Sequence, residues 1–426
     1  MEFKNIKTTY PSTFVTKINN KNIYIDGLID GEDIELNNNN VKIIKKSDER
    51  IDNGCKYQDI CGGCQFMHIN YDYEIKLKEK YLNELFSCFH KTIKIIDAKD
   101  KYLNYRNKCQ MNYTTDKKGN ILCGLYEEHS HNIVIIEDCM LQPKNINKII
   151  SEINNILKSN KIIPFTKGGV LKNIFIRYGF NSKEIMIVFV TSDIQFPGAN
   201  KLIKDLINHK LGITTIVQNI NSRNTPIVLG DKNKILYGPG YIIEYLDSYK
   251  FKISPNSFFQ INTNMMEKIY NTAINMAKLS PNEIVIDAYS GIGSISIFLA
   301  KHVKKVISVE LNKNAHNDAK INAKLNNIKN ITFYNNDATK FINNISNIKI
   351  DTIFIDPPRE GTTLQFIKVI SKLQIKKVIY ISCNPITLKR DLLLFKAEKY
   401  QINDIISLDN FSRTKHVETV CCLIKR

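Results

Sequence analysis

The sequence has no tryptophan, only eight arginines among 426 residues, and no long apolar run. None of its apolar stretches approaches the roughly 20 residues that a membrane-spanning helix needs, so we expect no association with a membrane. The first residues, MEFKNIKTTYPS, lack the apolar segment of a secretory signal. We therefore expect a cytoplasmic protein. There, ten cysteines are expected to be metal ligands, catalytic groups or buried side chains rather than disulfides.

The formal net charge of +18 favours a polyanionic partner, most simply nucleic acid. The chain is also crowded with lysine, asparagine and isoleucine, which is typical of an AT-rich genome. Such a genome raises the lysine content without any selection for binding. The charge alone therefore leaves the nature of the partner open.

The chain is long enough for two or three domains. Residues 1–48 alternate short β-type runs with Gly, Asp and Asn turns, including an asparagine loop at 37–40, which predicts a small all-β unit. Residues 49–253 combine a cysteine cluster with strands and a few helices, which indicates a mixed α+β domain. In residues 254–426, from Ile284 onward, apolar strands alternate with helices. This alternation predicts an α/β fold with a parallel, doubly wound sheet.

Apolar periodicity also predicts the individual elements. In the central region it predicts helices over 73–86, near 145–157 and near 200–209. In the C-terminal region it predicts strands in EIVIDAY, KKVISVE, ITFYNND, IDTIFID and KKVIYIS, and helices that begin at Ser294, Asn314 and Pro385.

In a doubly wound sheet, ligands bind beyond the carboxyl ends of the strands, so the residues there deserve a separate reading. The first strand ends in Asp287-Ala-Tyr-Ser-Gly291-Ile-Gly293, and Ser296 replaces the third glycine of a dinucleotide fingerprint. The second strand ends in Glu310, nineteen residues after Gly291. A carboxylate at that place can accept both hydroxyls of a ribose. Later strands end near Asp337, Asp356 and Cys383.

This order of residues resembles the class I methyltransferases, which bind S-adenosylmethionine. The resemblance implies that Gly291 and Gly293 admit the methionine end of the cofactor, that Glu310 binds the ribose and that Asp337 lies at the adenine side. A nicotinamide-dependent enzyme is the rival interpretation, because Gly-x-Gly before a helix serves both cofactors. The alternative for Asp287 and Glu310 is that they are solvated residues at strand ends without a function in binding.

The stretch Ile-Ser-Cys383-Asn384-Pro385 places a cysteine directly before a predicted helix. Asn384 is a good N-cap and Pro385 suits the first helical position. The partial positive charge of a helix N-terminus favours a thiolate at Cys383. A buried filler is expected in the middle of a strand, as Cys421 and Cys422 are, and a metal ligand needs further cysteines nearby. We therefore interpret Cys383 as a nucleophile.

A nucleophilic thiol beside a methyl donor indicates methylation of carbon 5 of uracil. That carbon attacks a sulfonium methyl only after a thiolate has added at carbon 6. A base must then remove the carbon 5 proton before the thiol is eliminated. Glu418, in His416-Val-Glu418-Thr, is the candidate base, and a salt-bridged surface acid is its alternative.

Six motifs of residues 254–426 resemble the RNA uracil-5-methyltransferase family, in the order that the family has them. They are Ser257-Phe-Phe-Gln-Ile-Asn, Asp287-Ala-Tyr-Ser-Gly-Ile-Gly, Val309-Glu, Asp356-Pro-Pro-Arg-Glu-Gly, Ser382-Cys-Asn-Pro and His416-Val-Glu-Thr-Val. The resemblance implies that Gln260 and Tyr289 contact the cofactor. It also implies that Asp356 is an active-site acid close to cofactor and base. Asn336 precedes Asp337, and either residue can serve the adenine.

A second cysteine motif, Cys55-x5-Cys61-x2-Cys64, contains three possible metal ligands. Zinc and a four-iron cluster both accept four thiolates, so the spacing alone does not choose between them. The resemblance implies a [4Fe–4S] cluster of structural role, with Cys139 in Glu137-Asp-Cys139 as the fourth ligand. We interpret Cys88, Cys109 and Cys123, which lack this context, as core residues.

The resemblance implies transfer of a methyl group from S-adenosylmethionine to carbon 5 of a uridine in 23S ribosomal RNA, through a covalent cysteine–uracil adduct. Ribosomal RNA is preferred because transfer-RNA members of the family typically lack the cluster. The alternatives are the same chemistry on uridine 54 of transfer RNA, an NAD-dependent oxidoreductase, or an inactive homologue that remodels RNA.

Two further expectations concern RNA binding. The N-terminal β unit resembles, in position and size, the small RNA-binding TRAM barrel of these enzymes. Phe258 and Phe259 can support an extruded base, with at least one of them expected in the core. We expect the enzyme to act as a monomer.

Overall fold

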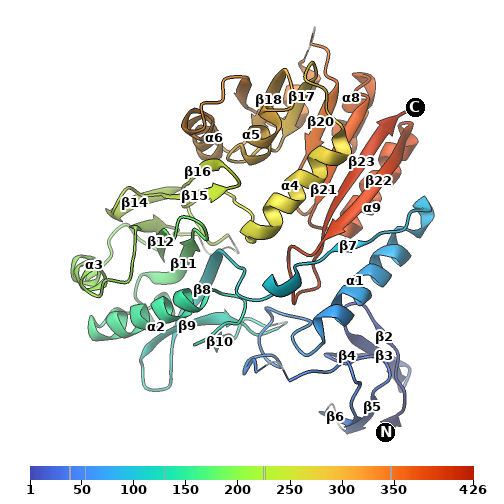
Figure 1. Cartoon of the computed structure of the whole chain (residues 1–426). Helices are drawn as coiled ribbons and strands as arrows, with labels where there is room; N and C mark the ends of the chain where they lie inside the picture. Colours follow the sequence, from blue (N-terminus) through green and yellow to red (C-terminus); the bar gives the residue numbers. More distant parts are fainter. Residues whose placement is uncertain (38–39, 53, 129, 224, 226, 346–347) are drawn as a thin grey trace.

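The protein was analysed as a computed structural model that describes residues 1–426 except 38–39, 53, 129, 224, 226 and 346–347. Three sheet-containing regions follow one another along the chain (Figure 1). The N-terminal unit lies below helix α1, the central sheet lies at the lower left, and the C-terminal sheet with its helices forms the upper half.

The N-terminal unit consists of two three-stranded antiparallel sheets, β1-β5-β6 and β2-β3-β4. Its apolar residues alternate with polar ones, as in β5, so that one side of each strand faces a small core of Ile6, Phe14, Leu28 and Ile34. Within the described residues no strand pairing joins the two sheets into a closed barrel, so the barrel stays a prediction. The strands are β1 Glu2–Phe3, β2 Thr8–Thr9, β3 Thr13–Ile18, β4 Lys21–Asp26, β5 Asp33–Asn37 and β6 Asn40–Lys45.

The predicted asparagine loop at 37–40 joins β5 to β6. Asn37 and Asn40 pair with each other as the last and first residues of these strands. Residues 38–39, the centre of the predicted loop, lie outside the described residues.

The central region is a seven-stranded sheet in the order β10-β9-β8-β11-β12-β13-β14. β12 is apolar and buried along its whole length, because helices cover one face of the sheet and the C-terminal half packs on the other. The covering helices are α2 Lys144–Ser159 and α3 Ala199–Asn208, within two residues of the predicted bounds. The strands are β8 Lys108–Thr115, β9 Ile121–Tyr126, β10 Ile133–Ile135, β11 Leu171–Tyr178, β12 Ile185–Thr191, β13 Thr215–Ile220 and β14 Lys232–Tyr237.

Short elements complete this region. The hairpin of β15 Ile242–Leu246 and β16 Tyr249–Ile253 leads into the C-terminal half. Single 3-10 turns occur at Ser87–Phe89, Lys99–Lys101 and Phe165–Lys167.

The C-terminal region is built on an eight-stranded sheet in the order β19-β18-β17-β20-β21-β23-β22-β7. The strands from β19 to β21 are parallel, and β23 inserts antiparallel between β21 and β22. Helices α4 and α5 pack on one face, and α8 and α9 pack on the other. The strands are β17 Ile284–Ala288, β18 Lys305–Glu310, β19 Ile331–Asn335, β20 Thr352–Ile355, β21 Lys377–Ser382, β22 Tyr400–Leu408 and β23 Glu418–Lys425.

Six helices accompany these strands: α4 Thr263–Ala277, α5 Ser294–Ala300, α6 Lys313–Leu325, α7 Ala338–Asn343, α8 Leu364–Lys372 and α9 Pro385–Ala397. The predicted starts of α5 and α9 are confirmed, and α6 begins one residue before its predicted start. The α/β fold is confirmed, with a mixed rather than purely parallel sheet because β23 is antiparallel.

One segment of the predicted central domain belongs by contact to the C-terminal half. Helix α1 (Tyr71–Leu85) buries Leu82 in the core beneath α8 and α9. Strand β7 (Ile95–Ile96) pairs in parallel with Ser407 and Leu408 of β22. Residues 71–96 therefore complete the C-terminal sheet, and the domain bounds 1–48, 49–253 and 254–426 remain a prediction.

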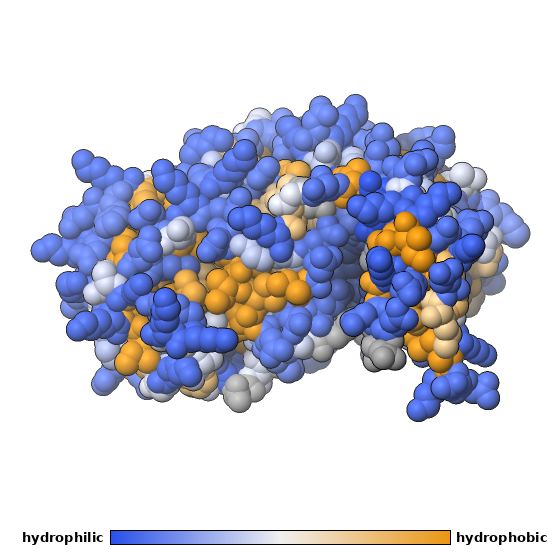
Figure 2. Space-filling view, turned by 90° about the horizontal axis from the view of Figure 1, so that it is seen from below, coloured by the Kyte–Doolittle hydropathy of each residue, from blue (hydrophilic) through white to orange (hydrophobic). Residues whose placement is uncertain are grey.

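The lower face of the molecule is mostly hydrophilic, with hydrophobic side chains gathered in its middle and a hollow beside them (Figure 2). A cavity of about 580 Å³ lies where the N-terminal unit meets the cysteine loop, lined among others by Leu28, Arg50, Cys64 and Lys415. No helix of the described residues is both long and apolar enough to cross a membrane.

Candidate active site

The parallel strands bring their carboxyl ends to one edge of the C-terminal sheet. Asp287 lies at the end of β17, Glu310 at the end of β18, Asp356 directly after β20 and Cys383 directly after β21. Glu418 begins the antiparallel β23, next to the end of β21, where Ser382 pairs with Thr419. Antiparallel insertion of β23 thus places a carboxylate at the edge where the parallel strands end.

The loop after β17 has the backbone that its glycines require. Gly291 and Gly293 have φ of 55° and 80°, in the left-handed region that favours glycine. A Cβ on Gly293 would lie 3.0 Å from the Cβ of Ala319 in α6, so a larger residue there would push the helix away. Tyr289 also has a positive φ, of 67°, and its hydroxyl lies 3.2 Å from Thr362 Oγ1.

Glu310 is half-buried and held by backbone donors on both oxygens. The N–H of Gly291 donates to Oε2 at 2.8 Å, and the N–H of Asn312 donates to Oε1 at 2.6 Å. Each carboxylate oxygen has a second lone pair, so the side chain can still accept two hydroxyl groups. The two bonds orient Glu310 toward the glycine loop, as a ribose-binding acid requires.

Asp287 is fully buried, so the solvated strand end considered for it is wrong. Burial raises the pKa of Asp287 to about 7, against a hydrogen bond from Ser296 Oγ at 2.5 Å that lowers it. Its Oδ1 has no partner among the described residues. Ser296, which breaks the dinucleotide fingerprint, is therefore a structural partner of this carboxyl.

Asp337 caps helix α7, because its side chain accepts the N–H of Lys340 at 2.9 Å. Asn336 accepts the N–H of Asp337 at 2.8 Å and is itself bonded through its backbone to Glu310. Both adenine-side candidates thus lie next to Glu310. One oxygen of Asp337 is already used by the cap, which leaves the other for a ligand.

Gln260 joins the cofactor side to the central domain. The Asn107 side chain, at the entry to β8, donates to the carbonyl of Gln260 at 2.7 Å. The Asn410 amide donates to Gln260 Oε1 at 3.4 Å and to Glu418 Oε2 at 3.3 Å. Asn410 is fully buried and had no place in the sequence-based prediction. Its position two residues after β22, in the loop that precedes Glu418, was the available signal.

Cys383 is half-buried and lies just before α9, which Asn384 caps and Pro385 begins, as predicted. Burial raises the pKa of the Cys383 thiol to about 11, and Glu418 and Asp356 raise it further. Arg359 opposes them. In the protein alone, burial and the two carboxyls outweigh Arg359 and favour the thiol, contrary to the predicted thiolate.

Arg359 was also not singled out from the sequence. Its carbonyl accepts hydrogen bonds from Asn384 Nδ2 and from Thr387 Oγ1, both at 3.0 Å. These bonds tie the Asp356-Pro-Pro-Arg359 loop to the first turn of α9. The loop therefore holds one cation and one carboxyl beside Cys383.

Glu418 and Asp356 form a pair of acids, of which Glu418 is fully buried and Asp356 is half-buried. Burial raises the pKa of both carboxyls, and the charge of Asp356 raises the pKa of Glu418 further. Hydrogen bonding from Asn410 and the charge of Arg359 work in the opposite direction. Both upward shifts move the pKa of a carboxyl toward the neutral range, in which general acid–base catalysis operates. The alternative of a salt-bridged surface acid is wrong for Glu418, which is fully buried.

The loop before Glu418 is anchored on α1 by buried charges. Lys78 Nζ lies 2.7 Å from Glu74 and 2.6 Å from Asp409, and all three side chains are fully buried. The Arg413 backbone N–H donates to Glu74 at 2.8 Å, and its guanidinium lies over the rings of Tyr71 and Tyr102. The position of Glu418 therefore depends on a helix more than 300 residues earlier in the chain.

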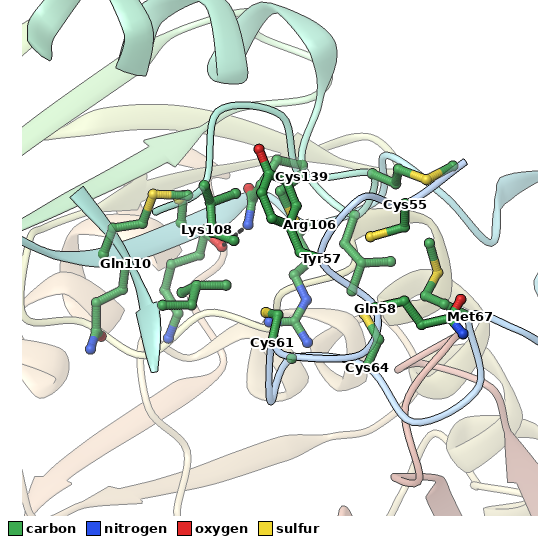
Figure 3. Close-up of a pocket in the computed structure, with 18 residues that line it drawn as sticks. Cys55, Tyr57, Gln58, Cys61, Cys64, Met67, Arg106, Lys108, Gln110 and Cys139 are labelled. Atoms are coloured by element: carbon green, nitrogen blue, oxygen red, sulfur yellow. Dashed lines mark hydrogen bonds between the residues drawn. The ribbon is translucent and has the colours of Figure 1, made fainter. Parts of the chain in front are cut away.

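The four predicted metal ligands lie in one cavity. Cys55, Cys61, Cys64 and Cys139 line a hollow of about 210 Å³ together with apolar side chains, and Figure 3 shows the Arg106 guanidinium between Cys61 and Cys64. Burial raises the pKa of Cys61, Cys64 and Cys139, and the neighbouring thiols raise it further. The loop and the strand region that carry them are joined by Tyr57, whose hydroxyl accepts the N–H of Glu137 at 3.1 Å.

This donor set fits an iron–sulfur cluster in chemistry. Thiolates are the ligands of such clusters, and Arg106 supplies a positive charge to an otherwise unbalanced set. Among the described residues no group of three or more His, Cys, Asp or Glu is arranged to hold a metal ion. A four-iron cluster holds its ligands at separate irons and so spreads them further apart than one ion does. The cluster remains a prediction.

Of the predictions for the other cysteines and for the two phenylalanines, some are confirmed and one is wrong. Cys109 and Cys123 are buried, as predicted, whereas Cys88 is exposed at the end of α1 and the prediction of a core role is wrong. The short turn Ser87–Phe89 carries it outward. Phe259 is in the core and Phe258 is 62% exposed, so at least one of the pair is core, as expected.

The comparisons with known proteins cover the whole site. A family model described as tRNA (Uracil-5-)-methyltransferase matches residues 70–426. An uncharacterized RNA methyltransferase of Staphylococcus aureus strain MSSA476 is 34% identical, over 97% of this chain and 96% of that protein. One of Clostridium tetani is 34% identical, over 95% and 92%. The solved tRNA (uracil-54, C5)-methyltransferase of Pyrococcus abyssi, in complex with S-adenosyl-L-homocysteine, is 26% identical with a TM-score of 0.79 over 100% of both chains.

Proposed function

Because the chain belongs to the tRNA (uracil-5-)-methyltransferase family, we propose that it transfers a methyl group from S-adenosylmethionine to carbon 5 of a uridine in RNA. Membership of this family excludes the nicotinamide-dependent oxidoreductase, the alternative that the Gly-x-Gly motif had left open. The observation that carries the proposal is the meeting of Cys383, Asp356 and Glu418 at one edge of the sheet. S-Adenosylmethionine supplies an electrophilic methyl group when bound, and Gln260, Tyr289, Gly291, Gly293, Glu310, Asp337 and Asp356 are the residues proposed to hold it.

The proposed reaction begins at Cys383. Its thiolate forms a bond to carbon 6 of uracil, and the ring's electron pair moves to carbon 5, which takes up the methyl group. Glu418 then accepts the carbon 5 proton, and the electrons of that bond expel the thiolate from carbon 6. The net change replaces hydrogen by methyl on carbon 5, converts S-adenosylmethionine to S-adenosylhomocysteine and releases one proton.

The raised pKa of Cys383 requires a proton acceptor before the addition. Two carboxyls are available, and each has a pKa raised toward the neutral range by burial. We assign the thiol proton to Asp356 and the carbon 5 proton to Glu418. The thiol proton returns to sulfur when the product leaves, so Asp356 is ready for the next cycle.

The proposed substrate is 23S ribosomal RNA, acted on by the monomeric protein. Four cysteines that line one cavity support a [4Fe–4S] cluster held by Cys55, Cys61, Cys64 and Cys139, and such clusters are typical of ribosomal-RNA members of the family. The cluster would join the cysteine loop to the Cys139 region. It takes no part in the reaction above.

Transfer RNA is the second candidate substrate. The tRNA (uracil-54, C5)-methyltransferase of P. abyssi covers the full length of this chain at a TM-score of 0.79. Incubation with radiolabelled S-adenosylmethionine and unmodified transcripts of each RNA separates the two. We expect label in 23S RNA, and label in transfer RNA alone would overturn the assignment.

The covalent mechanism is tested with Glu418→Gln. Addition and methyl transfer proceed without the base, but the carbon 5 proton stays and the thiol cannot leave. The variant should accumulate a protein–RNA adduct that survives denaturing electrophoresis and carries the labelled methyl group.

Cys383→Ala is the control, and it should give neither adduct nor product, alone or combined with Glu418→Gln. Normal turnover by Glu418→Gln would make Asp356 the next candidate for the base. Methylation by Cys383→Ala would overturn the covalent mechanism, and inactivity of the unaltered protein on every RNA would support the inactive homologue.

Glu310→Ala tests the cofactor assignment separately. Hydrogen bonds to a charged group contribute about 1.5–3 kcal/mol each, so loss of the ribose contacts should weaken S-adenosylmethionine binding at least tenfold. Calorimetry measures this without RNA. An unchanged affinity would place the ribose elsewhere.

A further inference from the structure

A separate cavity of about 310 Å³ opens beside the thiol of Cys383. Its wall comes from three distant parts of the chain: Tyr10 of the N-terminal unit, Tyr81 of α1, and the loops that carry Arg359, Cys383 and Lys415. The residues that hold the cofactor in the proposed function are not part of this wall. The target uracil must turn carbon 5 toward the methyl donor while carbon 6 meets Cys383, so the part of this cavity that lies away from the cofactor residues is free for another nucleotide of the same RNA.

Two aromatic rings stack in the wall of this cavity. The ring centroids of Tyr10 and Tyr81 are 4.0 Å apart, with an angle of 6° between the planes. The Tyr10 hydroxyl donates to the carbonyl of Lys415 at 2.5 Å, which holds the ring over the active-site loop. Both side chains are half-buried, so part of each remains accessible from the cavity. Every nucleobase has a flat face that can extend such a stack.

The charge of the cavity fits the backbone of RNA. Arg359 and Lys415 are exposed cations in the wall, and the described lining contains no carboxylate. His416 is also in the wall, and burial together with the two cations lowers its pKa to about 4. It is therefore neutral at physiological pH and can share hydrogen bonds with a base or sugar. Cations beside stacked rings are the combination that binds single-stranded nucleic acid.

We propose that this cavity is a second nucleobase subsite, which holds the unpaired base next to the target uridine on the Tyr10–Tyr81 stack. The inference rests on the proposed function and deepens it. When carbon 6 of the target is bonded to Cys383, the neighbouring nucleotide of the same strand is one backbone step away. Arg359 and Lys415 then face the phosphate between the two nucleotides. Binding the neighbour outside the duplex stack also helps to keep the target extruded.

In this proposal the N-terminal unit binds RNA directly beside Cys383. Tyr10 lies between β2 and β3 of that unit and reaches the loop before Glu418. The competing explanation is that the stacked rings only fasten the unit to α1. The two explanations differ in one respect: only a subsite makes the rings sensitive to what stands at the neighbouring position of the RNA.

The test pairs a protein change with an RNA change. The probe is a synthetic RNA hairpin whose loop carries the uridine that the protein methylates, in its unmodified form. One version is intact, and two others have an abasic site directly before or directly after that uridine. Tyr81→Ala should weaken binding of intact RNA, measured by fluorescence anisotropy, at least about fivefold, the lower range for stacking of one base. KM should rise by a similar factor, with kcat changed less than about threefold because the reacting groups are intact.

The abasic probe provides the decisive comparison. At one of the two neighbouring positions the abasic site should weaken binding to the unaltered protein by the same factor, yet cause no further loss in Tyr81→Ala. If the loss of affinity caused by the abasic site multiplies with the loss caused by Tyr81→Ala at both positions, the subsite is overturned. The rings would then only attach the N-terminal unit to α1. Tyr81→Phe keeps the ring and should bind as the unaltered protein does. Tyr245→Ala, which removes a tyrosine on β15 that lies outside this cavity, is the control.

Circular dichroism checks that Tyr81→Ala folds. If it does not, Tyr10→Ala replaces it, and the same comparison of intact and abasic RNA applies. If the unaltered protein methylates no RNA, the proposed function falls. A fluorescent eight-nucleotide oligouridylate then tests the subsite by binding alone: an affinity unchanged by Tyr81→Ala would overturn it, and a fivefold loss would support it.

Discussion

Cys383, the proposed nucleophile, has surroundings that hold it as a thiol. Burial and two carboxyls raise its pKa to about 11, while Arg359 and the start of α9 act in the other direction. A thiol in this state is protected from alkylation and oxidation until a substrate changes the balance. The residue is thus inert at rest and needs its neighbours to become reactive.

Arg359→Ala should make the thiol less reactive still. Loss of the Arg359 charge, which lowers the pKa of Cys383, raises that pKa, and a rise of about half a pKa unit lowers the thiolate fraction about threefold. The measurement is the rate of iodoacetamide labelling of Cys383 at pH 9, resolved by peptide mass spectrometry.

Exposed Cys88 serves as the internal reference in the same sample, and its rate should not change. Arg359→Lys keeps the charge and should react almost as the unaltered protein does. A Cys383 rate that is equal in all three proteins would show that Arg359 does not act on the thiol.

Asn410 should set the pH range in which Glu418 works as the base. Its N–H donates to Glu418 Oε2 and so favours the ionised carboxylate. Without that bond the pKa of Glu418 rises, and the carboxylate forms only at higher pH. The rising limb of kcat against pH should therefore move upward by about 0.5–1 unit in Asn410→Ala.

Activity of Asn410→Ala should recover as the pH increases toward 9, which a merely misfolded variant would not do. A lower rate with an unchanged pH profile would mean that Asn410 shapes the site without acting on the proton. The bond to Gln260 predicts in addition a higher KM for S-adenosylmethionine.

Among the elements, α1 determines where the loop before Glu418 lies. Lys78 is fully buried and balances Glu74 and Asp409, which are also fully buried. Removing Lys78 leaves two buried acids without a cation. Lys78→Ala should therefore lower the free energy of unfolding by about 3–5 kcal/mol and reduce methyl transfer even below the melting temperature.

Urea unfolding and activity at 25 °C measure the two effects. Lys80→Ala, at an exposed position of the same helix, is the matched control and should stay within about 0.5 kcal/mol. A Lys78→Ala protein that is less stable yet fully active would show that the buried charges do not determine the position of Glu418.

Elements with local signals could be predicted from the sequence. α9 begins where Asn384 and Pro385 indicate, because the cap and the proline act within one turn. α4 was missed although Asn262 caps it, since its apolar residues face two partners and blur the helical pattern. β7 has only two residues and exists through its pairing with β22, which no local pattern carries.

In the candidate site, too, the residues with a local sequence signal could be predicted and those that depend on tertiary contacts could not. Strand ends and motif spacing led to Cys383, Glu310 and Asp356, because a parallel sheet gathers those positions. The pKa of Cys383 could not be predicted, since it depends on burial and on Glu418 from a strand inserted from later in the chain. Tyr10 had no signal at all, because its ring meets Tyr81 only in the folded protein.

For the whole molecule, the proposed cluster would join the cysteine loop to the edge of the central sheet. Cys55, Cys61 and Cys64 come from one loop and Cys139 from beyond β10, and all line one cavity. Protein purified without oxygen should be brown, with about four irons per chain. Cys139→Ser should lose the colour and the iron.

Cys123→Ala is the control, because Cys123 is buried against Met111 outside the proposed ligand set, and it should keep both. Stoichiometric zinc without iron would contradict the cluster. Iron retained by Cys139→Ser would mean that another group is the fourth ligand.

The contact of Tyr10 with Lys415 has a consequence for the order of folding. The hydrogen bond joins residues 405 positions apart, and contacts of such sequence separation form late because a long loop must close first. Synthesis makes Tyr10 and its stacking partner Tyr81 early, yet the Tyr10 hydroxyl has no access to its acceptor until Lys415 has been added. The wall of the cavity beside Cys383, which includes both Tyr10 and Lys415, is therefore complete only when almost the whole chain has been synthesised.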